Sequence, residues 1–200
     1  MKKQFLYINW WVPKENFDNY YDFLQSIDFN PYAEKFQSWN KTLWEYLGDD
    51  WEYMRAPFKE RWYSDYEAWK IMFEKTLPYL RDDIVIGAWS LWWTFIIKYL
   101  YENKFPVKIK RLIFIAAALN DSDIEKLGTF HLNKEKIANI ISQVGNMIVY
   151  HSTDDDIVPF SDFLEMKKYF PTATFREFTD KWHFYKEARL PEIEEDIKRA

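Results

Sequence analysis

The stretch Ile84-Val85-Ile86-Gly87-Ala88-Trp89-Ser90-Leu91-Trp92-Trp93 carries the pattern on which the predicted fold depends. The β-branched residues 84–86 predict a short buried strand, and the mostly apolar residues 91–103 predict a helix. Ser90 therefore falls on the turn between a strand and a helix. A serine at such a place is most often only a helix cap, but the same turn presents a hydroxyl at the carboxyl edge of a sheet.

Strands and helices alternate along the rest of the chain. Continuous apolar runs at residues 111–116 and 146–150 are typical of strands buried on both faces of a parallel sheet. Further strands are expected at residues 4–8, 51–55 and 174–178, and further helices at residues 16–27, 32–47, 65–80, 133–144, 161–170 and 191–199. Ser64 is expected to cap the helix at 65–80, and Gly145 to end the helix at 133–144. The alternation predicts a three-layer α/β/α fold around a doubly wound, mostly parallel sheet.

The length and composition are those of one folded soluble domain. The 200 residues are 48% hydrophobic and 30% charged, and we expect a single domain over residues 1–200. No apolar run approaches the roughly 20 residues of a membrane helix. The apolar residues 5–12 lack a cleavage site and are interpreted as a first strand rather than a signal peptide. The absence of cysteine excludes disulfides and thiolate nucleophiles and is compatible with the cytoplasm, the location that we predict.

The charges of the chain bear on its partners. With 27 basic and 32 acidic residues the net charge is −5, and the lysines are scattered rather than clustered. Neither nucleic acid nor a membrane is therefore expected as a partner. With three histidines and no cysteine the chain has few side chains suited to bind a transition metal, so neither a metal nor a cofactor is expected. The sequence leaves the oligomeric state open.

Two later segments supply the groups that a serine nucleophile needs. Asp155 lies in Thr-Asp-Asp-Asp-Ile-Val-Pro at 153–159, after a predicted strand, and His183 lies in Asp-Lys-Trp-His-Phe at 180–184. An imidazole can take the proton of a serine, and a carboxylate can hold that imidazole in the right tautomer. Adjacent aspartates are more often a solvated turn, and His151, at the end of a strand, is interpreted as structural. His183 is expected at the same edge of the sheet as Ser90.

Together these segments resemble the small single-domain serine hydrolases of the α/β-hydrolase fold, the group that includes retinoblastoma-binding protein nine. The likeness spans nearly the whole chain. It implies that Ser90 is the nucleophile, that His183 is its base and that Asp155 orients His183. It also implies an oxyanion hole formed by the backbone N–H groups of Leu91 and Trp10. The implied activity is carboxylesterase-like hydrolysis of an ester or another small-molecule acyl substrate, without a cofactor.

Tryptophan stands at five positions where the resembled group has glycine: Trp10, Trp11, Trp92, Trp93 and Trp182. Glycine and tryptophan are the extremes of size, so chance exchange at tight turns is improbable. One hypothesis is that these codons are UGA, which some bacterial lineages read as glycine and others as tryptophan. UGA at these positions, with UGG at Trp39, Trp44 and Trp69, would support it, and UGG throughout would exclude it.

The other hypothesis is that the indoles are genuine. In that case Trp11, Trp89, Trp92 and Trp182 are expected to line a substrate pocket. Two further functions then remain open beside the hydrolase. The chain is either a catalytically inactive relative that binds an apolar ligand or partner through a tryptophan-rich site, or a protein whose indoles only fill its core.

Overall fold

The computed structural model describes residues 2–8, 38–56 and 65–200. Within them, strands lie in the order β2-β1-β3-β4-β5-β6, and every neighbouring pair is parallel. Their bounds are β1 Lys3–Ile8, β2 Trp51–Arg55, β3 Ile84–Trp89, β4 Ile109–Ile115, β5 Val144–Ser152 and β6 Thr174–Phe178. The chain winds from β1 to β2 at one edge and then to β3 on the other side of β1. The carboxyl ends of β1 and β3 therefore flank the point where the winding reverses, a common place for ligands in such sheets. The predicted doubly wound parallel sheet is confirmed.

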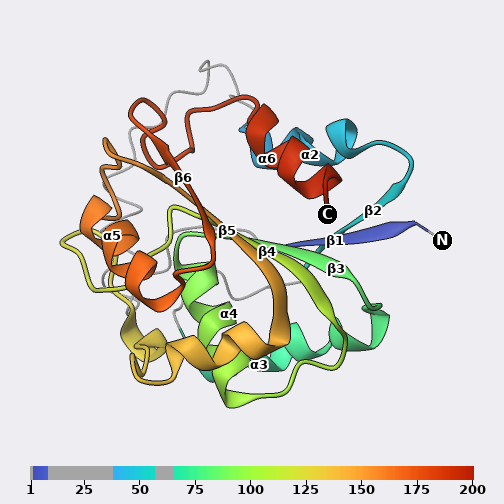
Figure 1. Ribbon diagram of the computed structural model, residues 1–200, viewed down its shortest axis with the longest axis horizontal. Helices are drawn as coiled ribbons and strands as arrows, with labels where there is room; N and C mark the ends of the chain where they lie inside the picture. Colours follow the sequence, from blue (N-terminus) through green and yellow to red (C-terminus); the bar gives the residue numbers. More distant parts are fainter. Residues whose placement is uncertain (1, 9–37, 57–64) are drawn as a thin grey trace, which may run out of the picture.

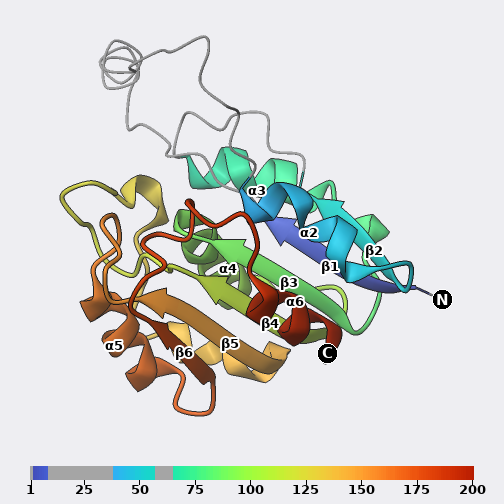
Figure 2. The same cartoon turned by 90° about the horizontal axis from the view of Figure 1, so that it is seen from above.

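Helices cover both faces of the sheet, as Figures 1 and 2 show. The α-helices are α2 Trp39–Leu47, α3 Tyr66–Glu74, α4 Leu91–Glu102, α5 Phe160–Tyr169 and α6 Pro191–Lys198. Short 3-10 helices lie at Leu77–Tyr79, Gly128–Phe130 and Ile137–Gln143. Buried residues of α3, α4 and α5 form one hydrophobic cluster, and those of α2 and α6 form the other. The predicted three-layer α/β/α architecture is confirmed.

Alternate residues of each strand enter the two clusters, because successive side chains of a strand point to opposite faces. In β3, Ile86 and Ala88 belong to the cluster with α4, whereas Val85 and Trp89 belong to the cluster with α2 and α6. Since both faces are covered, β3 is buried along its whole length. This double burial explains why β3 is a continuous apolar run rather than an alternating one.

The structure corrects two expected helices. The helix predicted at 65–80 is shorter, because α3 ends at Glu74 and a 3-10 turn containing Pro78 follows. Its cap is Asp65, whose side chain accepts a hydrogen bond from the Ala68 N–H at 2.8 Å. Ser64, the expected cap, lies outside the described residues, as do the helix predicted at 16–27 and residues 32–37 of the next one.

The prediction of an α-helix at residues 133–144 is wrong. A 3-10 helix occupies Ile137–Gln143, and β5 begins directly at Val144. Gly145 therefore lies in a strand and does not end a helix. A Cβ atom at this position would lie 2.9 Å from the Lys110 carbonyl oxygen, so glycine here permits the close approach of β4 and β5.

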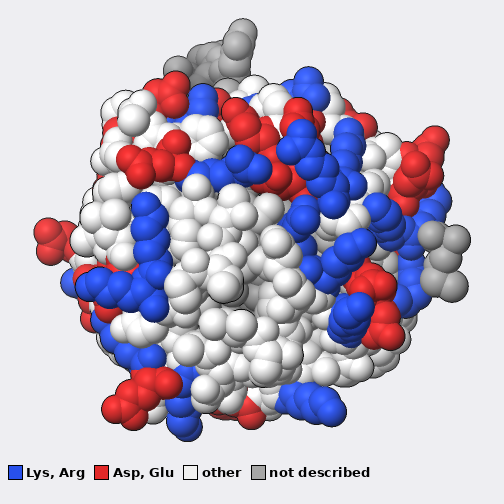
Figure 3. Space-filling view, in the orientation of Figure 1, with Lys and Arg blue, Asp and Glu red and all other residues white. Residues whose placement is uncertain are grey.

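The surface seen in Figure 3 carries basic and acidic side chains intermixed around a central uncharged region. In the part of the chain that the structure describes, no helix has both the length and the apolar character needed to cross a membrane.

Candidate active site

Ser90 occupies a strained turn between β3 and α4. Its φ is +54° and its ψ is −132°, a conformation that residues with a side chain rarely adopt. The backbone N–H of Ser90 donates to the Ile115 carbonyl at 2.9 Å, which ties the turn to the end of β4. The side chain is fully buried. Helix α4 begins at the next residue, so the N–H groups of its first turn face the region around the Ser90 hydroxyl.

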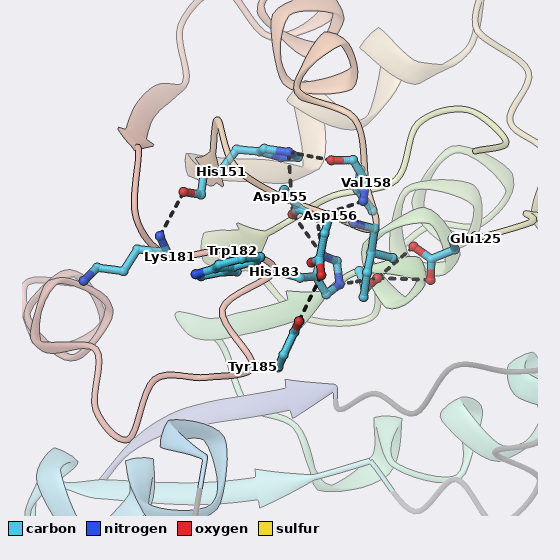
Figure 4. A network of polar contacts seen from close by, with 12 residues as sticks. Glu125, His151, Asp155, Asp156, Val158, Lys181, Trp182, His183 and Tyr185 are labelled. Atoms are coloured by element: carbon cyan, nitrogen blue, oxygen red, sulfur yellow. Dashed lines mark hydrogen bonds and ion pairs between the residues drawn. The ribbon is translucent and has the colours of Figure 1, made fainter. Parts of the chain in front are cut away.

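The structure brings Ser90, His183 and Asp155 together. Nε2 of His183 lies 2.9 Å from the Ser90 Oγ, and its Nδ1 lies 2.9 Å from Oδ2 and 3.0 Å from Oδ1 of Asp155. The side chains of His183 and Asp155 are inaccessible to solvent. Figure 4 shows His183 between Asp155 and a further carboxyl, that of Glu125. An imidazole held on one side by a carboxylate and on the other by a hydroxyl can take the hydroxyl proton.

Asp155 is itself held by its own loop. Its Oδ1 accepts hydrogen bonds from the N–H groups of Ile157 at 2.9 Å and Val158 at 2.8 Å. His151 lies on the other side, with Nε2 at 3.1 Å from the Val158 carbonyl oxygen and 3.7 Å from Oδ2 of Asp155. Burial lowers the pKa of His151. A neutral His151 that donates through Nε2 to Val158 supports the loop, so this histidine is placed as a structural neighbour of Asp155.

His183 lies between two residues with left-handed backbone conformations. The φ of Trp182 is +51° and that of Phe184 is +60°. This region favours glycine, because a Cβ atom crowds the carbonyl oxygen there. The resemblance expected glycine at position 182, and the backbone at this position has a conformation that suits glycine.

Neighbouring segments hold this turn. Trp39 of α2 donates through its indole N–H to the Phe184 carbonyl at 2.9 Å. Oδ1 of Asp154 accepts from the Trp182 N–H at 3.0 Å. Burial raises the pKa of Asp154, but its hydrogen bonds, including that from Trp182, bring the pKa below its usual value. The two anchors fix the backbone on both sides of His183.

Glu125 is a residue at this site that the sequence analysis did not identify. Its Oε2 lies 2.8 Å and its Oε1 3.0 Å from the Ser90 Oγ, and the side chain is buried. The backbone N–H of Leu91, the expected oxyanion donor, lies close enough to this carboxyl to act on its pKa. Burial raises the pKa of Glu125, although nearby His183, the Ser90 hydroxyl and the Leu91 N–H act in the opposite direction. Glu125 lies 35 residues from Ser90 in a segment without any motif, so no signal in the sequence pointed to it.

The tryptophans predicted for the site lie in different surroundings. The ring of Trp89 stacks against the His183 imidazole, with centroids 5.7 Å apart and planes at 29°. Trp92 lies in the core, stacked on Trp69 with centroids 3.5 Å apart. Trp10, the expected second oxyanion donor, and Trp11 lie outside the described residues.

Two other tryptophans have distinct contacts. Trp93 is buried, and its indole N–H donates to the Ala118 carbonyl at 2.9 Å, which ties α4 to the loop after β4. Trp182 is 41% exposed, and the Lys186 ammonium lies 3.2 Å from the centroid of its ring. The described tryptophans therefore do not form one common wall beside Ser90. Among residues 2–8, 38–56 and 65–200, no cluster of three or more histidine or acidic side chains is arranged to bind a metal ion.

No protein-family model matches the chain, and neither does any curated protein. Solved structures do. The ydeN gene product from B. subtilis has a TM-score of 0.71 and 16% identity, over 100% of this chain and 98% of that one. Est1E from Butyrivibrio proteoclasticus has a TM-score of 0.60 and 11% identity, over 99% and 86%. MGS-M1, an alpha/beta hydrolase enzyme from a deep-sea metagenome library of the Medee basin, has a TM-score of 0.51 and 15% identity, over 90% and 69%. At these identities the likeness concerns the fold, and it shows that the chain has the α/β-hydrolase fold.

Proposed function

We propose that the protein is a serine hydrolase that acts on an ester or another small-molecule acyl substrate. The observation that carries the proposal is the unbroken chain of contacts from the Ser90 Oγ through His183 to the Asp155 carboxylate, each step 2.9 Å long. The strained turn at Ser90 is a second support, because such strain is typical of functional positions. The structural neighbour described as a hydrolase agrees with this class of activity.

In the proposed reaction, His183 takes the proton of Ser90 as Oγ attacks the acyl carbonyl carbon. The resulting imidazolium is stabilised by Asp155 and passes the proton to the leaving group as the carbon–oxygen bond of the ester breaks. Water then attacks the acyl-enzyme and gives its proton to His183. The carboxylic acid leaves, and Ser90 regains its proton.

The proposed oxyanion donor is the Leu91 N–H at the first turn of α4. A helix N-terminus favours a developing negative charge, and the partial charge there lies close to the attacked carbon. The N–H of Trp10 is proposed as the second donor. Every step uses groups of the chain and water, and we propose that no cofactor takes part.

The finer assignments remain proposals of the same kind. We place the chain beside the retinoblastoma-binding protein nine group on the residues around Ser90, Asp155 and His183. A single domain over residues 1–200, a cytoplasmic location, a small-molecule substrate, and neither nucleic acid nor a membrane as partner all stay predictions. The alternative of an inactive relative with a tryptophan-rich ligand site has less support, because Trp92 and Trp93 are packed in the core.

A fluorophosphonate probe tests the proposal directly. The protein is incubated with the probe, and the phosphonylated residue is identified by mass spectrometry. We expect labelling at Ser90 that disappears in Ser90→Ala and persists in Ser142→Ala, which removes an exposed hydroxyl far along the chain. If the folded protein gives no label at Ser90 at any probe concentration, in the wild type and in Glu125→Ala alike, the hydrolase is ruled out.

A further inference from the structure

The contacts of Glu125 fall on the atoms that would react. Its carboxyl touches the nucleophilic Ser90 Oγ at 2.8 and 3.0 Å, and it lies close enough to the Leu91 N–H for that group to act on its pKa. In the proposed mechanism these two groups face the carbonyl carbon and the oxyanion of the substrate. A carboxyl group beside both occupies the place of the acyl group.

The hydrogen atoms can be arranged around Ser90 in two ways. In one, neutral His183 accepts the Ser90 proton, and a protonated Glu125 donates to the Ser90 oxygen. In the other, an imidazolium at His183 donates to Ser90, and Ser90 donates to an ionised Glu125. With Asp155 ionised, both arrangements have the same net charge. Ser90 faces the Glu125 carboxyl in each of them, and a substrate carbonyl cannot take the place beside Ser90 Oγ that the carboxyl occupies.

Burial favours the first arrangement, in which Glu125 is protonated. Glu125 is 2% exposed, and its removal from water raises the pKa of its carboxyl. A carboxylic acid held against Ser90 and Leu91 N–H has the chemistry of the product of ester hydrolysis before its release. Glu125 therefore presents to the site the same functional group that the reaction would produce.

The backbone around Glu125 is anchored. The Leu119 N–H donates to the buried Asp162 carboxylate at 2.6 Å, and the Glu125 N–H donates to the Ser122 Oγ at 2.8 Å. The Ser122 hydroxyl in turn donates to the Ile157 carbonyl at 3.0 Å. Because these bonds tie the segment at both ends, the carboxyl can leave Ser90 most easily by rotation about the side-chain bonds of Glu125.

We infer that the space beside Ser90 Oγ and Leu91 N–H is a carboxylate-binding position, that Glu125 fills it as an internal ligand, and that the acyl group of a substrate enters only when Glu125 swings out. The same position then holds the carboxylate of the acid product. This inference depends on the proposed hydrolase function.

The rate of phosphonylation measures how often the position is free. The observed rate is the intrinsic rate multiplied by the fraction of molecules in which Glu125 is displaced. If Glu125 fills the position nine-tenths of the time, its removal raises the rate about tenfold. We therefore expect the fluorophosphonate to label Glu125→Ala about tenfold faster than the wild type. The control Glu135→Ala, which removes an exposed carboxylate, should label at the wild-type rate.

Acetate adds a second measurement, because it has the atoms that Glu125→Ala removes: one carbon and the carboxyl group. Acetate should slow the labelling of Glu125→Ala in a saturable way. The wild type should need about tenfold more acetate for the same slowing, since Glu125 competes with acetate for the position. These rates are measured at constant ionic strength.

The outcomes separate the two proposals. If neither the wild type nor Glu125→Ala is labelled at Ser90, the hydrolase function fails and the inference fails with it. If the wild type is labelled but Glu125→Ala is labelled no faster, or acetate has no effect on the variant, the hydrolase stands and the internal ligand is overturned. Should Glu125→Ala fail to fold, Glu125→Asp replaces it. Its carboxyl is shorter by one carbon–carbon bond, about 1.5 Å, so it should label faster than the wild type, and an equal or lower rate would again overturn the inference.

Discussion

Nδ1 of His183 lies 2.9 Å from Oδ2 of Asp155, while the other carboxylate oxygen, Oδ1, accepts from the N–H groups of Ile157 and Val158. Asp155 thus shapes its own loop and orients the imidazole with one side chain. Because both oxygens of Asp155 accept hydrogen bonds, a neutral His183 carries its proton on Nδ1 and can accept the Ser90 proton at Nε2.

Asp155→Asn should abolish most activity without unfolding the protein. The Asn oxygen can still accept from Ile157 and Val158, so its amide NH₂ is turned toward His183. A donor there forces Nδ1 to accept, the proton moves to Nε2, and His183 can no longer take the Ser90 proton. We expect the turnover of an aryl ester to fall by about ten-thousandfold. Asp156→Asn is the matched control, because the Asp156 carboxylate contacts Tyr185 instead. Similar losses in the two variants would contradict the assigned role of Asp155.

At position 182, glycine should give a more stable protein than alanine. Both substitutions remove the indole and its contact with Lys186, so they differ only in the backbone, which has a φ of +51°. We expect Trp182→Gly to unfold with a free energy about 1 kcal/mol higher than Trp182→Ala, measured in urea. The order should reverse at Trp44, inside α2, where glycine is expected to be about 1 kcal/mol worse than alanine. An alanine preference at both positions would show that the left-handed conformation of residue 182 is not maintained.

The indole of Trp92, unlike that of Trp182, should contribute strongly to stability, although the resemblance expects glycine at both positions. Its indole is buried and stacks on Trp69 at 3.5 Å between centroids. Removal of such a side chain leaves a cavity, and we expect Trp92→Ala to cost about 3–5 kcal/mol of unfolding free energy. Ile71→Ala, on the exposed face of the neighbouring helix α3, serves as the control with a cost of about 0.5 kcal/mol or less. A small loss at Trp92 would mean that the core closes around the missing indole.

The stability of the protein should depend on pH through Glu125. Burial raises its pKa in the folded state above the ordinary value of 4.5, while Asp155 acts in the same direction and His183, Ser90 and Leu91 oppose it. Below pH 4.5 the carboxyl is protonated in both states, so it costs nothing there. As the pH rises, the unfolded chain loses this proton first, and the wild type loses stability by up to about 1.4 kcal/mol per pH unit until the folded pKa is reached.

Glu125→Gln cannot lose a proton at this position. Its unfolding free energy relative to the wild type should therefore increase as the pH is raised from about 4 toward neutrality. The comparison is made by urea denaturation at each pH, with Glu135→Gln as the variant of an exposed carboxylate, whose difference from the wild type should stay constant. A constant difference for Glu125→Gln as well would mean that the folded-state pKa of this carboxyl is not raised.

The sequence by itself determined the architecture and the three residues on which the proposed function rests. Strands such as β3 and β5 are runs of apolar residues that only a doubly covered parallel sheet can bury, so their composition alone indicates the sheet. Ser90 and His183 could be selected because each stands in a short segment after a strand, where parallel sheets collect functional groups. The resemblance singled out Asp155 among three adjacent aspartates. These signals are local in the chain and need no knowledge of the packing.

The tertiary structure alone decided which residues surround these three. Glu125 meets Ser90 across 35 residues of chain, and neither periodicity nor a motif marks a single carboxyl in a loop. The burial of the tryptophans could not be predicted from the sequence either. Trp92 stacks in the core and Trp182 lies at the surface, although both stand where the resemblance expects glycine. The role of Gly145, which was expected to end a helix, also depended on packing, because the glycine lies in β5 where β4 approaches closely. Contacts between distant segments depend on how the layers pack, and packing is a property of the folded chain rather than of any short stretch within it.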